Sequence, residues 1–480
     1  MHLKVMRRLT KILLLLLFST SLSAQSYIFE SCISNSHYKS IFEDSPIDIL
    51  KCASDSTNTL TFGSKLYAIN SFINKDKITN AYLIGLSLKG GIKNKFKLLV
   101  SYDYLNGNFS SEIKKYQDSL GLYFPGFGDS NKRFQFNARY FASEFIKIDL
   151  GNAKHFIGDG YQSLLLSDVA SEYPYLKIST EFGPIRYYNL YTTFINPNLI
   201  DFGRKKHATI HYLNFSITPK INFGLFESIL WQSKTEAVNK GYEFAYLNPV
   251  IFYRPVEFSK KSDKGNALIG ANFNIKLYTV LFYGQLMLDD LNISRQKDND
   301  DDYQQGFFQN KYGYQLGFKG KIKSLNYLFE FNQVQPYTYG HRTILQNYSH
   351  MNQALSHPLG ANFKEFISIL EFRKGNWNYH FKSMIAFVGL DSLGTHYGQD
   401  IFQSDIDAST GGQYSYGNYN GQGVNTRIIS LDAEVSIKLK SIDIFGIISC
   451  RTKKSDLIDQ TLIFYSLGVR TFPFSSFSDY

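Results

Sequence analysis

The sequence predicts an all-β fold, an antiparallel transmembrane barrel of roughly 14–18 strands. Many segments alternate apolar and polar residues with a period of two. No stretch beyond the N-terminus approaches the roughly 18 consecutive apolar residues of a membrane helix. The chain is also rich in aromatic residues, with 41 Phe and 35 Tyr but only 2 Trp among 480 residues. This pattern favours strands that have one face toward lipid and the other toward water.

The first 24 residues are typical of a secretory signal peptide. Four Lys and Arg residues and no acid precede the apolar run Ile12–Phe18, and the small residues of Ser21–Ala24 suit cleavage before Gln25. Together with the barrel pattern, this leader predicts the outer membrane of a Gram-negative bacterium. Without those four cations the formal charge falls from +10 to +6. The chain has no dense basic run, which argues against a nucleic-acid partner.

Residues 25–60 alternate poorly and are interpreted as a periplasmic cap or N-terminal extension, whereas residues 61–480 carry the barrel pattern. Cys32 and Cys52 lie in the first of these regions, and an oxidising periplasm allows a disulfide between them. The alternative is that all three cysteines, Cys450 included, are small apolar residues of the structure.

The predicted strands follow from the alternation. It is clearest in Ile429–Leu439, where six apolar residues face one way and Ser, Asp, Glu and Lys side chains face the other. Phe96–Leu105, Phe134–Tyr140, Tyr379–Phe387 and Ile463–Val469 repeat this pattern. Segments of about 9–12 residues match tilted strands that cross a bilayer, whereas soluble strands average about five or six.

Three segments are predicted to be long surface loops: the acidic Gln296–Gln305, Asn332–Phe363 with its three histidines, and the Gly- and Tyr-rich Gly411–Gly423. The chain ends in Phe477 and Tyr480. This aromatic ending resembles the insertion signal of outer-membrane barrels, and it predicts contact with the barrel-assembly machinery during biogenesis. A closed barrel also requires the first and last strands to meet, because an open edge is not satisfied in lipid.

One stretch between two predicted strands, His155–Asp168, concentrates chemically active residue types. Its glycines allow a tight turn or a close approach to another surface. Three interpretations remain open: a hydrolytic site, a structural loop folded into the lumen, and a carbohydrate contact. A hydrolase is disfavoured because G-x-S-x-G is absent. The candidate residues are His155, Gly158, Asp159, Gly160, Tyr161, Ser163, Ser167 and Asp168.

Two later stretches also hold candidates for the lumen or for polysaccharide contact. Tyr246–Phe258 contains two prolines, which exclude it from a central strand. Its candidates are Asn248, Arg254 and Glu257, of which the last two suit an ion pair inside a lumen. Ser356–Asn362 contributes His357 and Asn362. No segment shows the spacing of a zinc or calcium site, so neither a metal nor a cofactor is expected.

These blocks resemble the Wzi-type capsule assembly family and, more closely, its Bacteroidetes relatives, the RemB-like gliding-motility proteins. The resemblance rests on His155–Asp168 with Tyr173–Ile178, on Tyr246–Glu257, on Asn310–Gly317 and on Ser349–Phe363, which occur in the same order. It runs from about Phe134 to Phe372, with weaker similarity onward to Tyr480. It implies an outer-membrane barrel, of eighteen strands in the Wzi case, with inward loops in its lumen.

The resemblance also implies a non-enzymatic, lectin-like role in which the barrel binds or organises a surface polysaccharide in capsule or exopolysaccharide assembly or retention. The expected partners are outer-membrane lipid and that polysaccharide, with gliding-motility proteins as an alternative. Tyr414, Tyr416 and Tyr419 are the candidates to stack on sugar rings from an outer loop. A passive porin-like channel and an outer-membrane hydrolase are two competing interpretations of the same barrel.

Overall fold

A computed structural model of the chain describes most of it from residue 59 onward. The described ranges are 59–73, 77–93, 95–109, 111–123, 130–199, 204–234, 241–242, 244–249, 265–291, 308, 310–392, 395–405 and 417–471. The predicted signal peptide and the pair Cys32 and Cys52 lie outside these ranges, as does the predicted cap except for residues 59 and 60, which begin β1. Cys450 lies half-buried in the wall with a free thiol.

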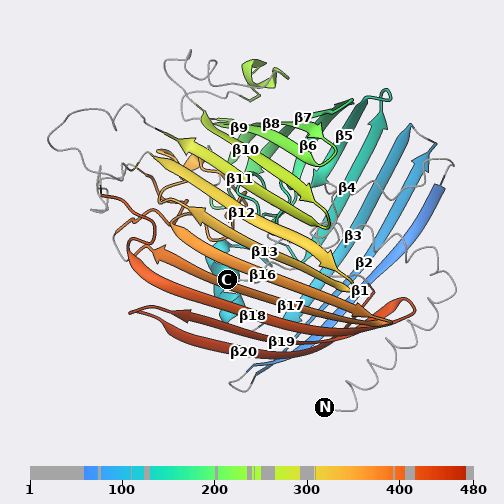
Figure 1. The fold of residues 1–480 in the computed structure, drawn as a ribbon, viewed down its shortest axis with the longest axis vertical. Helices are drawn as coiled ribbons and strands as arrows, with labels where there is room; N and C mark the ends of the chain where they lie inside the picture. Colours follow the sequence, from blue (N-terminus) through green and yellow to red (C-terminus); the bar gives the residue numbers. More distant parts are fainter. Residues whose placement is uncertain are drawn as a thin grey trace.

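Eighteen antiparallel strands form one sheet that closes on itself (Figure 1). The sheet closes where β1 pairs with β20, from Tyr67 opposite Arg470 to Ile73 opposite Phe464. This is the upper end of the predicted strand number, and the predicted fold class is confirmed. Within the described residues, no helix is both long and apolar enough to cross a bilayer.

The barrel strands run from 8 to 16 residues in length. They are β1 (Thr59–Ile73), β2 (Lys77–Ile92), β3 (Phe96–Asn108), β4 (Lys132–Phe141), β5 (Ile146–Ala153), β6 (Tyr173–Phe182), β7 (Ile185–Ile195), β8 (Lys205–Thr218), β9 (Ile221–Gln232), β10 (Asn266–Leu277), β11 (Val280–Asp290), β12 (Lys311–Ile322), β13 (Leu325–Val334), β16 (Phe363–Lys374), β17 (Trp377–Leu390), β18 (Val424–Leu439), β19 (Ile442–Lys454) and β20 (Asp459–Arg470).

The alternation places apolar side chains outside and polar ones inside. In β18, Leu431 and Val435 are exposed on the outer face, as the pattern of Ile429–Leu439 predicts. The intervening Asp432 faces the lumen, where it lies 3.4 Å from both Lys382 of β17 and Arg451 of β19. Inward charges are therefore paired across neighbouring strands, which is the condition for burying them.

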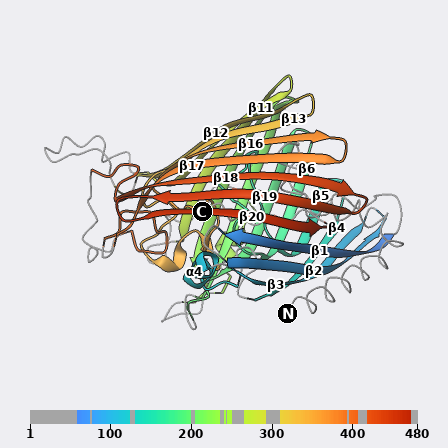
Figure 2. The ribbon, with the colours of Figure 1, turned by 90° about the horizontal axis from the view of Figure 1, so that it is seen from below.

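The two ends of the barrel differ. At one end, the turn end, neighbouring strands are joined by short turns, and Tyr278, Lys323 and Lys440 hold the positive φ angles that two-residue hairpin turns need. At the other end, the loop end, most connections are long, and α4 (Ser111–Leu120) lies among them (Figure 2). In outer-membrane barrels short turns face the periplasm and long loops face outward, which assigns the loop end to the cell exterior.

The connection between β13 and β16 corrects one sequence prediction. Asn332–Phe363 was expected to be a surface loop, but residues 335–362 fold into the lumen, with a 3-10 turn η3 (Ile344–Gln346) and a short hairpin of β14 (Ser349–His350) and β15 (Gln353–Ala354). Tyr339, Tyr348 and Leu355 are fully buried there, in one core with Leu164–Leu166 of the β5–β6 loop. The aromatic and leucine side chains explain the difference, because they bury apolar area that a surface loop would leave in water.

A second connection covers the outside of the wall. The strap, defined as described residues 241–242 and 244–249 with the 3-10 turn η1 (Phe244–Leu247), follows β9 and lies against the outer face of β7–β9. The hydroxyls of Thr209, Tyr191 and Tyr187 donate to the carbonyls of residues 246, 247 and 249 at 2.8, 3.0 and 2.5 Å. On the same outer face of β8 and β9, the polar side chains of His211 and Glu227 are almost completely buried.

The two tryptophans of the chain differ in their position relative to the strap. Trp377 lies on the outer face at the turn end and is 45% exposed, whereas Trp231 is 4% exposed and its ring lies 5.0 Å from that of Tyr246 in the strap. We expect brominated phospholipids to quench the fluorescence of Trp377 strongly and that of Trp231 weakly. Steady-state quenching of the single-tryptophan variants W231F and W377F in vesicles measures both. Equal quenching of the two variants would contradict the placement of the strap.

Candidate functional site

The loop that joins β5 to β6, residues 154–172, crosses the lumen. It leaves the wall at β5 but makes its main hydrogen bonds with β10–β13, and the bonded residues are up to 169 positions apart in sequence. Leu164, Leu165 and Leu166 are completely buried in the core with the β13–β16 loop. The two inward loops together are called the plug below.

The two close glycines let this loop lie directly on the wall. A Cβ atom at Gly158 would lie 2.1 Å from Nε2 of Gln285, and one at Gly160 would lie 2.1 Å from Oε2 of Glu330. Gly158 also has a φ of 143°, which residues that carry a Cβ atom rarely adopt. The glycines of the sequence motif therefore serve close packing of backbone against side chains.

The wall satisfies the backbone of the loop. The carboxylate of Glu330 accepts hydrogen bonds from the N–H groups of Tyr161 and Gln162 at 2.8 and 3.0 Å. The amide of Gln285 accepts from N–H of Leu164 at 2.8 Å and donates to the carbonyl of Ile157 at 3.0 Å. Because an unpaired buried backbone group costs about 1–3 kcal/mol, these side chains fix the position of the loop.

Gln285 belongs to a row of polar side chains in register across β10–β16. We call it the amide row, and it consists of Asn272, Gln285, Gln315, Asn332 and Glu365. The amide of Asn332 donates to both Glu330 and Glu365 at 2.9 Å. At the end of the row, Nε2 of His357 lies 2.8 Å from Oε2 of Glu365, and both side chains are completely buried. His357, a sequence candidate, thus anchors the second plug loop.

The serines of the central motif are engaged in structure. The hydroxyl of Ser163 donates to the carbonyl of Ile157 at 2.5 Å and accepts from N–H of Leu165 at 3.1 Å. The hydroxyl of Ser167 donates to the carbonyl of Ser356 in the second plug loop. The ring of His155 packs on Tyr173 and Tyr175, at centroid distances of 5.6 and 4.4 Å. These contacts support the structural interpretation of the motif over the hydrolytic one.

The remaining residues of the motif bind the loop to the wall or to itself. The side chain of Asp159 accepts from Asn274 at 3.0 Å. The ring of Tyr161 lies 5.5 Å below the ammonium of Lys382, which also donates to its hydroxyl at 3.4 Å. The main-chain carbonyl of Asp168 accepts from Lys154 at 3.1 Å.

The described part of the β17–β18 loop is held against the plug at the loop end. Asn362 sits at a φ of 57° and its amide nitrogen donates to the carbonyls of Gly389 and Gln422 at 2.8 and 2.9 Å. Its amide oxygen accepts from N–H of Gly421 at 2.7 Å. Asn420 donates to the carbonyls of Val334 and Phe363 at 2.6 and 3.1 Å. Three chain segments therefore meet at this point.

This junction displays one aromatic side chain. Tyr419 begins a turn closed by the bond from N–H of Gln422 to its carbonyl at 3.2 Å, and its side chain is 64% exposed. The amide of Gln422 extends the support by donating to the carbonyl of Tyr397 at 2.9 Å and to Asn418 at 3.0 Å. We call residues 417–423 the platform. Sequence candidates Asn362 and Tyr419 thus belong to one unit, the first supporting the second.

A carboxylate organises the segment beside the platform. Asp391 accepts from the N–H groups of Tyr397 and Asp400 at 2.5 and 3.1 Å and lies 3.1 Å from Nδ1 of His396. Burial raises the pKa of this carboxyl, but the hydrogen bond and charge of His396 and the two backbone N–H groups together bring its pKa below the usual 3.8. The segment that carries Tyr397 is therefore held by an ionised group.

Not all sequence candidates reach the plug. Asn248, a candidate for the lumen or for polysaccharide contact, is exposed in the strap on the outer face, because the Pro-containing segment cannot join the sheet and packs against the wall instead. Arg254, Glu257, Tyr414, Tyr416 and the acidic Gln296–Gln305 lie outside the described residues.

Sequence reasoning missed the amide row and Asp391. Amide side chains at inward positions of consecutive strands are the signal that could have found the row.

Replacing Glu330, which bonds both the plug and Asn332 of the amide row, tests whether the polar inner wall holds the plug. Glu330→Ala leaves the N–H groups of Tyr161 and Gln162 without their acceptor, at a cost of roughly 1–3 kcal/mol for each buried donor. We expect the ion conductance of the purified protein in planar bilayers to rise above that of the parent. Glu371→Ala is the matched control, because Glu371 is buried in the same wall but bonds Asn326 and Arg373 near the turn end. An unchanged conductance of Glu330→Ala would contradict this role.

Protonating or replacing Asp391 should loosen the segment of Tyr397 and Asp400. Since its pKa is lowered in the folded protein, the stabilisation is present above about pH 3.8 and is lost as the pH falls through the folded value. At neutral pH, Asp391→Asn should reduce the hydrogen-exchange protection of both amides by roughly tenfold, the equivalent of one weakened hydrogen bond. Asp456→Asn in an exposed turn is the control. Equal protection in the Asp391 variant and the parent would rule out this support.

Comparisons with known proteins agree with the fold. No protein-family model matches the chain, and no curated protein matches it. Among solved structures it is similar to Wzi, an outer membrane protein involved in group 1 capsule assembly in Escherichia coli and described as a carbohydrate-binding β-barrel. That likeness has 13% identity and a TM-score of 0.54 and covers 86% of this chain and 84% of that one.

Two Pseudomonas aeruginosa proteins are more distant. OprD shows 9% identity and a TM-score of 0.45 over 85% of this chain and 94% of that one. OpdK with vanillate shows 10% identity and a TM-score of 0.45 over 85% of this chain and 97% of that one. Identities of this size inform the fold alone. The chain is thus an eighteen-stranded outer-membrane β-barrel of Gram-negative type whose lumen holds a plug formed by its own loops.

Proposed function

We propose that this protein is a non-enzymatic barrel that binds or organises a surface polysaccharide, in the assembly or retention of a capsule or exopolysaccharide. The observation that carries the proposal is the platform, where Tyr419 stands exposed at the loop end on a turn fixed by Asn362, Asn420 and Gln422. Aromatic faces suit the apolar faces of sugar rings, and amides and carboxylates suit their hydroxyls. The carbohydrate binding described for Wzi supports the same function for this chain.

The proposed mechanism divides the work between plug and platform. Sugar rings stack on Tyr419, and the half-buried polar side chains of Gln399, Asp400 and Gln403 in the neighbouring segment offer hydrogen bonds to hydroxyl groups. The plug, which the amide row of the wall holds in place, supports the platform from below. Tyr414 and Tyr416, which precede the platform in sequence, remain candidates for further stacking contacts.

Replacing the exposed tyrosine tests this proposal. We expect Tyr419→Ala to weaken binding of the host's own surface polysaccharide by roughly three- to tenfold, a change of up to about 1.4 kcal/mol, because one stacking contact is lost. A glycan-binding assay with purified protein in detergent measures it. Tyr278→Ala is the matched control, since Tyr278 is 96% exposed in a turn at the opposite end.

Two results would contradict the proposal. Equal affinity of both variants and the parent would remove Tyr419 from the binding surface. A parent protein without measurable glycan affinity would point away from polysaccharide altogether. A stable protein partner on pull-down would then indicate a component of the gliding-motility surface machinery, and high conductance of the unmodified protein would indicate a porin-like channel.

A further inference from the structure

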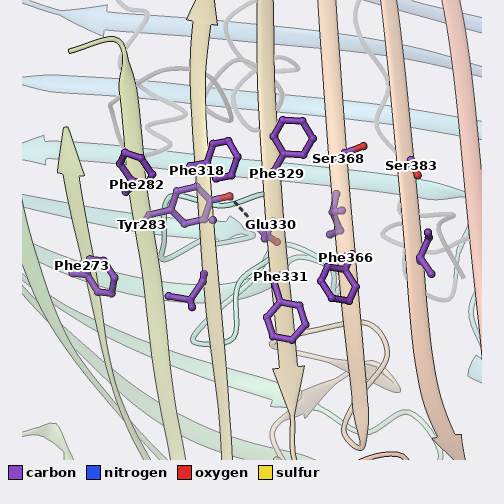
Figure 3. Close-up of a pocket in the computed structure, with 14 residues that line it drawn as sticks. Phe273, Phe282, Tyr283, Phe318, Phe329, Glu330, Phe331, Phe366, Ser368 and Ser383 are labelled. Atoms are coloured by element: carbon purple, nitrogen blue, oxygen red, sulfur yellow. Dashed lines mark hydrogen bonds between the residues drawn. The ribbon is translucent and has the colours of Figure 1, made fainter. Parts of the chain in front are cut away.

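The outer wall contains a groove that neither the plug nor the platform uses. It has a volume of about 650 Å³ and lies on β10–β13, β16 and β17 (Figure 3). Most of its lining side chains are outward ones, and Leu316 and Phe366 are each 52% exposed. The inward Tyr283 and Glu330, which also border it, are bonded to each other on the lumen side at 2.9 Å. The groove therefore opens to the outer face of the barrel.

The strand register explains the shape of the groove. Most of its lining residues belong to two rows that run across the strands, and each row consists of residues that are paired in register. Gly284 and Ile275 complete these rows but do not line the groove. The row nearer the loop end is Phe273, Gly284, Leu316, Phe331, Phe366 and Ile385. The row nearer the turn end is Ile275, Phe282, Phe318, Phe329, Ser368 and Ser383.

The hollow arises where the second row changes from large to small residues. The rings of Phe318 and Phe329 lie 5.2 Å apart, and the large side chains of the second row form a ridge that extends as far as β13. Ser368 and Ser383, paired with each other on β16 and β17, then leave a gap two strands wide. Phe366, whose ring lies 4.7 Å from that of Phe331, and Ile385 border the gap toward the loop end. Figure 3 shows both serines beside these phenylalanines.

The position of the groove determines what can occupy it. Ser368 and Ser383 lie near the middle of their strands, on the face that the outer-membrane location turns toward lipid. At that depth a barrel meets hydrocarbon chains rather than headgroups or water. Lipid tails are as apolar as the wall, so selective binding there depends on close van der Waals contact rather than on the hydrophobic effect. A concave aromatic surface offers a flexible chain more such contacts than a flat one.

We propose that this groove is a binding site for one acyl chain of a membrane lipid, distinct from the lipid that coats the rest of the barrel. The chain lies over the serines and between the phenylalanine ridges. The site is independent of polysaccharide binding, because it lies on the opposite face of the wall from the plug.

A tryptophan at the rim measures lipid binding at the groove directly. Phe329→Trp, in a background with Trp231→Phe and Trp377→Phe, is reconstituted in mixtures of dioleoyl- and dibromostearoyl-phosphatidylcholine. Ile448→Trp in the same background is the matched reporter, because Ile448 is 54% exposed at the middle of β19 on the plain outer wall. We expect quenching at the groove to indicate a lipid-binding constant about threefold or more above that of the matched reporter.

Filling the hollow should abolish the difference in lipid-binding constant between the two reporters. Ser368→Leu with Ser383→Leu is expected to lower the constant at Phe329→Trp to that of Ile448→Trp, while Ser64→Leu on the outer face of β1 leaves it unchanged. The circular dichroism of each variant establishes that the barrel is folded. Equal constants for both reporters before filling would overturn the proposal. The proposal would also be overturned if lipid quenched Phe329→Trp weakly and Ile448→Trp strongly. That result would indicate that protein, such as a second copy of the chain, covers the groove.

Discussion

The structure depends on one constraint, the need of a buried backbone for hydrogen-bond partners. A loop that crosses a lumen brings N–H and C=O groups into a place with little water, and neither helix nor sheet satisfies them there. Gln285, Gln315 and Glu330 supply those partners from the wall. The barrel therefore does more than enclose the plug, because its inner face is a set of side-chain partners for a specific course of the loop.

The same constraint explains which parts of the fold the sequence predicts. Alternation is a local signal, so the faces of Ile429–Leu439 and the closed barrel follow directly from the residues. The course of residues 154–172 does not, because its partners lie more than 100 positions away in sequence. The glycines at 158 and 160 indicate a close approach, but only the structure identifies the surface approached. The prediction for Asn332–Phe363 was wrong for a related reason: its polar and proline content is typical of surface loops, and the contacts that bury it are not local.

Outward polar residues mark the other limit of sequence reasoning. The rule that lipid-facing positions are apolar holds for β18 but fails at His211 and Glu227, which are buried on strands β8 and β9 close to where Thr209 bonds the strap. Of the candidate site, the residue types were predictable and their assembly was not. Asn362 and Tyr419 were both identified, but nothing in the sequence indicates that one amide holds the turn displaying the other. Asp391 escaped notice because a lone aspartate after a strand is usually a solvated turn residue.

A rigid platform matters for the kind of binding proposed. Each sugar contact on an exposed tyrosine is weak, and ordering a flexible loop at the moment of binding would consume much of its free energy. At the platform this ordering has already occurred during folding, through bonds from Asn362, Asn420 and Gln422. A polysaccharide presents the same ring many times, so weak contacts on many barrels add up through high effective concentration. Under this proposal, retention of a polymer at the cell surface requires only modest affinity at each barrel. It also requires that the plug hold every platform in the same position.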